Sequence, residues 1–176
     1  MWAALLAAAL LLALAGCGKK ESSNTEGRIG QKMETYFFDF TINEAYLSTA
    51  YESYTPREGH TVLVADVTVK NTSKGSIEMY DADFVLIWGE GDDDMAYPIT
   101  TDPESFEERD TVGQDQLPGT YTLGVDQERT GKLVFEAPAG VVDFSIWSLE
   151  MFDDGTEEGE TGDSYSIYFT AEDRTA

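Results

Sequence analysis

The pattern of hydrophobic and polar residues changes twice along the chain. An uninterrupted apolar run opens it, a short polar segment follows, and from about Met33 onward apolar residues recur mostly at every second position. A period of two is the repeat of a half-buried β-strand, whereas a helix repeats every 3.6 residues. Gly, Pro, Asn and Asp, which favour turns, separate these segments. The body of the chain is therefore predicted to be all-β.

Nine segments of the body are predicted to be strands. The clearest is residues 61–70, where apolar side chains alternate strictly with polar ones. The continuous apolar run over residues 84–88 is typical of a strand buried on both faces, and residues 97–100 are expected to pair back on it across the turn at 89–94. The other predicted strands are residues 36–42, with a continuation through Ala45 and Leu47, and residues 77–79, 121–125, 132–136, 142–151 and 164–170.

Residues 102–112 are the only segment of the body that is expected to form a helix, with Pro103 in its first turn. Many short strands without helices between them favour two packed antiparallel sheets over a parallel sheet. The expected architecture is a single β-sandwich domain over residues 33–176, a length that can bury a core without disulfides or metals.

The apolar run over residues 1–16 ends in small residues directly before Cys17. Residues 2–15 are 14 residues, too few for the roughly 20 that a membrane-spanning helix needs. We therefore expect a secretory signal peptide over residues 1–16, although it lacks the usual basic start. A cysteine at this position resembles the bacterial lipobox, which implies that Cys17 becomes the lipid-bearing first residue. Cys17 is the only cysteine, so we expect it to serve anchoring and not redox chemistry.

Residues 17–32 are expected to be a lipidated flexible tether, because they are rich in Ser, Gly, Lys and Glu. Residues 18–32 carry a net charge of +2 and residues 33–176 a net charge of −25. A basic segment is attracted to an anionic membrane and an acidic domain is repelled, so the domain is expected to stand off the bilayer. Nucleic acid is not an expected partner, because phosphate binding needs a basic surface.

Three segments resemble the immunoglobulin-like family of bacterial lipoproteins known as domain of unknown function 4352. Residues 64–73 (VADVTVKNTS) match its strand followed by Asn, residues 83–86 (DFVL) its next buried strand, and residues 130–138 (TGKLVFEAP) a late strand. The resemblance covers residues 34–170 and implies an immunoglobulin-like antiparallel β-sandwich, similar to a secreted mycobacterial antigen, with no catalytic residues. The chain departs from the family in its acidic segments at 89–94 and 152–163.

Candidate catalytic chemistry is sparse. The only histidine, His60, stands at the head of the clearest strand, and nucleophilic catalysis normally needs a base beside its nucleophile. The sequence contains no Gly-rich phosphate loop and no zinc-ligand spacing. We therefore expect neither enzymatic activity nor a cofactor.

Two acidic clusters define the alternative function, which is calcium or glycan binding through acidic loops. The candidate metal ligands are Asp92, Asp93, Asp94, Asp153 and Asp154. Calcium takes six to eight oxygen ligands, but neither cluster has EF-hand spacing, and solvated turns explain both more simply. A shared site would require that the two acidic loops converge at one end of the sandwich.

Tyr46, Tyr51 and Tyr54 lie in a segment with a less regular pattern. They would form either an exposed aromatic binding patch or a cap on the sandwich, and capping is the simpler interpretation. The function expected from the sequence is a lipid-anchored, non-catalytic, extracytoplasmic interaction module at the bacterial cell membrane. Its expected partner is a protein or a cell-envelope component.

Overall fold

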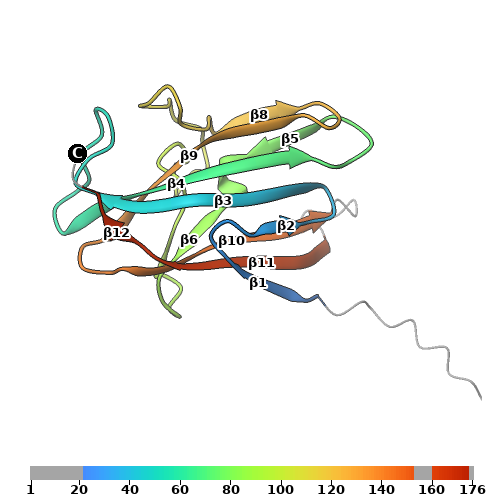
Figure 1. The fold of residues 1–176 in the computed structure, drawn as a ribbon. Coiled ribbons are helices and arrows are strands. Elements are labelled where there is room, and N and C mark those ends of the chain that lie inside the picture. Colours follow the sequence, from blue (N-terminus) through green and yellow to red (C-terminus); the bar gives the residue numbers. More distant parts are fainter. Residues whose placement is uncertain (1–21, 153–159, 175–176) are drawn as a thin grey trace, which may run out of the picture.

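The computed structural model describes residues 22–152 and 160–174, which form two packed β-sheets and a separate ribbon (Figure 1). Sheet A has the order β1 (Asn24–Arg28), β11 (Glu160–Thr170), β10 (Asp143–Phe152), β6 (Val85–Ile87) and β7 (Met95–Ala96). Sheet B has the order β12 (Glu172–Asp173), β3 (Phe38–Ser48), β4 (His60–Asn71) and β9 (Glu128–Pro138), with β2 (Lys32–Glu34) paired to β3. The ribbon consists of β5 (Ile77–Tyr80) and β8 (Thr120–Leu123). The predicted all-β, immunoglobulin-like sandwich is confirmed.

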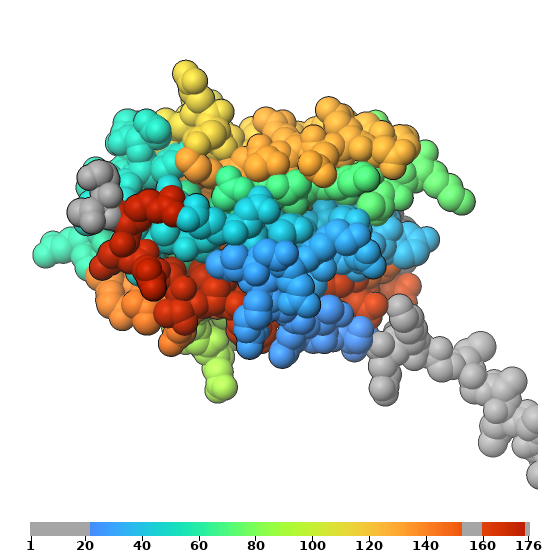
Figure 2. Space-filling model, viewed as in Figure 1, coloured from blue at the N-terminus to red at the C-terminus, as the bar shows by residue number. Residues whose placement is uncertain are grey.

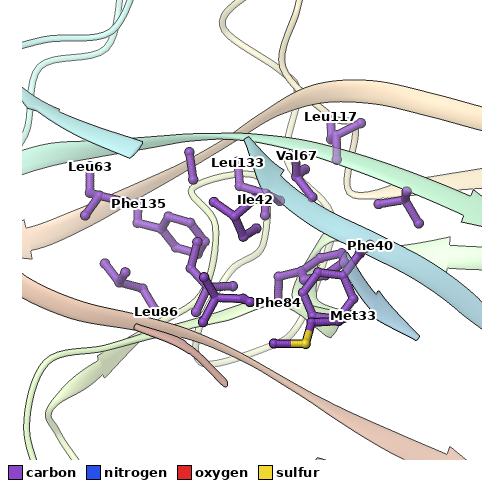
Figure 3. Packing of buried hydrophobic residues seen from close by; sticks show 14 of the residues in the cluster. Met33, Phe40, Ile42, Leu63, Val67, Phe84, Leu86, Leu117, Leu133 and Phe135 are labelled. Carbon is purple, nitrogen blue, oxygen red and sulfur yellow. The ribbon is translucent and has the colours of Figure 1, made fainter. Parts of the chain in front are cut away.

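The main core lies between the two sheets, and β4 shows how the alternating pattern builds it. Leu63, Val67 and their alternating neighbours on β4 are fully buried and face sheet A. Phe84 and Leu86 approach them from the opposite layer, as Figure 3 shows. The apolar rows that face each other across the two sheets therefore meet in one main core.

A second, smaller cluster covers the other face of sheet B. Val62 and Val64 of β4 point away from the main core and pack with Val134 and Tyr51. The long connection between β7 and β8 crosses this face, where the Ile99 amide donates to the Val134 carbonyl at 2.8 Å. The connection therefore also shields β9, which would otherwise be an exposed edge strand.

The helix expected over residues 102–112 is wrong. The Asp102 carboxylate accepts the Glu104 and Ser105 amides, and the Asp102 carbonyl accepts the Phe106 amide at 2.8 Å, which closes one turn. Phe106 then has a φ of 57° in the left-handed region, which ends the turn. The Arg109 amide donates back to Thr100, so the segment is a folded loop.

Part of the segment expected to be a flexible tether is a strand. Residues 24–28 form β1, which pairs in parallel with β11 although none of its residues has an apolar side chain. Gly27 makes this possible, because a Cβ at that position would meet the Met33 side chain at 2.1 Å. β1 joins sheet A and β2 joins sheet B, so the N-terminal strands close one side of the sandwich (blue in Figure 2).

The strand expected over residues 97–100 is also displaced. β7 comprises Met95–Ala96, which pair with Ile87 and Leu86 of β6. The chain then leaves sheet A, and Ile99 bonds to β9 of sheet B instead. Pro98 has no amide hydrogen to donate to a ladder, which agrees with the end of the strand before it.

Candidate functional site

The residues that flank the two acidic segments lie at opposite ends of sheet A. Asp94 closes the turn between β6 and β7, where its carboxylate accepts the Gly91 amide at 3.0 Å. This turn follows Ile87, which pairs with Ser145 near the start of β10. Asp153 and Asp154 lie outside the described residues, but the flanking pair Phe152 and Glu160 stands at the other end of β10. The strand residues that flank the two acidic segments therefore lie apart.

Within residues 22–152 and 160–174, no group of three or more acidic, His or Cys side chains is arranged to hold a metal ion. Calcium binding at the β6–β7 turn thus has no preformed set of ligands in the described part of the chain.

We predict that millimolar calcium raises the melting temperature no more than magnesium at matched ionic strength does. A strongly acidic domain is stabilised by any cation through screening, whereas a site gives saturable stabilisation. Replacing Asp92, Asp93 and Asp94 by Asn should accordingly change the calcium response no more than the magnesium response. A saturable shift with calcium alone, removed by the triple substitution, would instead establish a calcium site.

His60 occupies the first position of β4 and is partly exposed. Its Nδ1 lies 3.3 Å from the Glu58 carbonyl oxygen, a contact within its own turn. No nucleophile or carboxylate bonds to the ring in the described part of the chain, so the surroundings of His60 are those of a turn residue.

The three tyrosines of the irregular segment cap the sandwich. Tyr51 is buried and its hydroxyl donates to Asp115 at 2.6 Å, while the Tyr54 hydroxyl donates to Glu136 at 2.6 Å. The Arg174 guanidinium lies 3.8 Å from the centre of the Tyr46 ring. Burial and the hydrogen bond to Asp115 raise the pKa of the Tyr51 hydroxyl above its usual range. These contacts hold loops together and leave no aromatic patch of the three rings.

A buried carboxylate organises the end of the sandwich where the described chain begins. Glu150 of β10 is only 8% exposed and accepts the Tyr36 amide at 2.7 Å and the Tyr165 hydroxyl at 2.8 Å. It also accepts the Asp163 amide at 3.1 Å, so it ties β10 to β11 and to the β2–β3 turn. At the same end, the Ser23 amide donates to the Asp163 carboxylate at 2.8 Å. The first described residues are thereby fixed to this end.

An aromatic cluster lies beside this carboxylate. The rings of Tyr36, Phe37 and Phe152 contact one another with centroid distances of 5.0 to 5.4 Å. Tyr36 is 71% exposed, so the cluster forms part of the surface at the end where the chain enters.

A cleft of about 370 Å³ opens between β5, β10 and the β2–β3 turn. We call it the edge cleft, and its lining residues are Thr35, Phe37, Phe38, Ile77, Glu78, Met79, Tyr80, Asp83, Ser148, Leu149, Glu150 and Met151. Its walls are mainly apolar, its ionisable side chains are three carboxylates and one tyrosine, and no basic residue lines it. Burial raises the pKa of Asp83 to about 6.

A second hollow, of about 660 Å³, lies on the outer face of sheet A. Its floor includes the buried side chains of Ser145 and Ser166. Tyr168 and Trp88 also line it, and the Arg28 guanidinium lies 5.4 Å from the centre of the Tyr168 ring. Ile87, Ser145, Tyr168 and Arg28 form one cross-strand row, so strand register places hydroxyl and aromatic groups side by side. We call this hollow the serine groove.

Neither hollow was predicted from the sequence. Both depend on which strands pair and where pairing stops, and a local pattern of residues does not carry that information. Of the residues that the sequence did suggest, Asp92, Asp93 and Asp94 line neither hollow, and the three tyrosines are engaged in structural contacts.

The fold is an immunoglobulin-like β-sandwich that carries two surface hollows. The chain belongs to the family described as domain of unknown function DUF4352, whose model matches residues 27–159. The resemblance drawn from the sequence motifs is thereby confirmed. A comparison with curated proteins gave no match.

Solved structures with the same fold come from Bacillus subtilis. A candidate lipoprotein, YcdA, is 20% identical with a TM-score of 0.55 over 80% of this chain, and the chain spans only 38% of it. The YjhA protein is 18% identical with a TM-score of 0.55, and the match covers 80% of this chain and 99% of YjhA. At these identities the likeness shows a shared fold. No helix in the described ranges is long and apolar enough to cross a membrane.

Proposed function

We propose that the protein is a lipid-anchored, non-catalytic binding module on the extracytoplasmic face of the bacterial cell membrane. The observation that carries the proposal is the place where the chain enters the sandwich. Ser23 is bonded to Asp163 at one end, six residues after Cys17. Membership of the family and the fold shared with the candidate lipoprotein YcdA support the anchor.

The short connection gives the anchored domain an orientation. Ser22 is the fifth residue after Cys17, so the chain between them spans at most roughly 18 Å. The end that carries Tyr36 and Phe152 then faces the bilayer. The serine groove is lined by Asp143 and Thr170 at the opposite end of sheet A, so it opens away from the anchor. In this orientation the serine groove is accessible to a component of the cell envelope.

A protein or an envelope glycan is the proposed ligand of the groove. A glycan is favoured there over the acidic loops, because the groove combines aromatic rings with serine hydroxyls on one surface. The polar side chains of the groove, which include Arg28 and Asp143, would fix the orientation of such a ligand.

Cys17→Ala tests the anchor. One acyl chain binds a membrane only marginally, whereas the two or three chains of a lipoprotein hold it firmly. The variant should incorporate no labelled palmitate and should either leave the membrane fraction or accumulate as uncleaved precursor. Ser22→Ala, a polar change outside the lipobox, should label like the parent. Fatty acid on the Cys17→Ala variant would refute the anchor.

A further inference from the structure

We propose that the edge cleft binds an extended peptide of a partner protein as an added β-strand. The peptide would carry Lys or Arg beside apolar residues. This inference deepens the proposed binding role and rests on it, but it does not depend on the lipid anchor.

The edge cleft lies between two strand edges that lack a neighbour in the described structure. β10 pairs with β6 only over residues 145–147, so residues 148–152 of β10 have β11 on one side and no strand on the other. β5 pairs with β8 alone. Figure 1 shows β5 and β8 as a two-stranded ribbon that is separate from sheet A.

The lining residues show that the cleft meets the edges of these strands and not their faces. Residues 148–151 of β10 and all four residues of β5 line it without interruption. Successive side chains of a strand point to opposite faces. A hollow lined by consecutive residues therefore runs along the strand edge, where backbone groups other than the Tyr80 amide can pair with a new strand.

The side chains of the cleft specify the chemistry of the added strand. Ile77 and Met79 offer apolar walls, while Glu78 and Asp83 carry carboxylates. The Glu78 carboxylate accepts the Tyr80 hydroxyl, and the Asp83 carboxylate accepts the Tyr80 amide, so neither is neutralised by a cation in these contacts. A basic residue of the peptide would meet both carboxylates, and charge complementarity of this kind selects the partner.

Charge also argues against a second copy of this chain as the occupant. Each copy has a formal net charge of −23, so two acidic surfaces would meet at an acidic cleft. A basic partner segment relieves the repulsion that a second copy would increase.

The test uses the full chain purified in detergent micelles and two synthetic nine-residue probes. One probe alternates Lys with Val, and the other alternates Glu with Val. Amide hydrogen exchange is followed in residues 77–80 and 148–152, because an added strand protects backbone amides. With saturating Lys–Val probe we expect exchange to slow at least tenfold for those amides of both segments that make no bond to β8, β11 or Asp83. The Glu–Val probe should have no effect.

Matched variants separate charge recognition from general electrostatics. Glu78→Gln with Asp83→Asn should weaken the protection by the Lys–Val probe at least tenfold in probe concentration. Asp92→Asn with Asp93→Asn removes two charges from the β6–β7 turn and should leave it unchanged. Melting curves of both variants confirm that they fold.

Several outcomes would overturn the proposal. Equal protection by both probes, or none by either, would show that the cleft does not select a basic strand. Slow exchange of these free-edge amides before any probe is added would point to a second copy or to residues 17–21 as the occupant, and sedimentation would distinguish these. Failure of this test leaves palmitate labelling untouched, so the two proposals fail separately.

Discussion

Val67→Asp is expected to abolish the cooperative unfolding transition of the domain. Val67 is 0% exposed and lies in the middle of β4, paired with Ile42 on one side and Gly131 on the other. Its side chain points into the core between the sheets (Figure 3). An unpaired carboxylate there costs several kcal/mol, against a total stability of about 5–15 kcal/mol for a typical domain.

The neighbouring residue supplies the control for this substitution. Thr68→Asp adds the same charge one position along β4, on the face where Thr68 bonds to Thr130 at 2.8 Å. We expect it to lower stability by about 1 kcal/mol, the value of a lost surface hydrogen bond. Urea unfolding followed by circular dichroism measures both variants. A Val67→Asp protein that unfolds cooperatively near the parent's midpoint would contradict the assignment of this row to the core.

The strands of the core could be predicted because the apolar positions within each strand indicate which of its side chains are buried. The alternation over residues 61–70 reappears as the buried row of β4, and the apolar run at 84–88 becomes β6 with its flanking residues. Alternation is a local property of the sequence, so it can be recognised without knowledge of the partner strand.

β1 and the loop over residues 102–112 could not be predicted in this way. β1 is held by pairing to β11, with Asn24 opposite Ser164, 140 residues away along the chain. In the loop, Asp102 and Pro103 begin a helix-like turn, but the chain then folds back so that the Arg109 amide bonds to the Thr100 carbonyl. Both results depend on contacts that are distant in sequence.

The candidate site escaped prediction for a related reason. The edge cleft exists because the pairing of β10 with β6 ends where Trp147 faces Val85, while β10 continues to Phe152. Glu150, which holds that end together, is one acidic residue among 34 in the sequence. Its burial and its three donors are visible only once the β2–β3 turn is placed beside β10.

Asp81 gives the domain an unusual expected dependence on pH, to which Asp83, with a pKa that burial also raises to about 6, contributes in the same direction. Asp81 is 0% exposed, and the hydroxyls of Thr100 and Thr101 donate to its carboxylate, which fixes the β7–β8 connection to the core. Burial outweighs these bonds and raises the pKa of Asp81 to about 6, from an ordinary value of 3.8. The folded protein therefore holds this proton over a range in which the unfolded chain has lost it.

Stability should consequently fall as the pH rises from about 4 to about 6, because the native state binds more protons than the unfolded state in that window. The raised pKa corresponds to a loss on the order of 3 kcal/mol at neutral pH. Asp81→Asn cannot ionise and keeps an oxygen for the threonine hydroxyls, so its urea midpoint should fall less between pH 4.5 and 7. Asp93→Asn removes one charge from an exposed turn and measures the contribution of general repulsion. If the parent becomes more stable over this range, or if both variants follow the parent equally, Asp81 is not the group that sets the dependence.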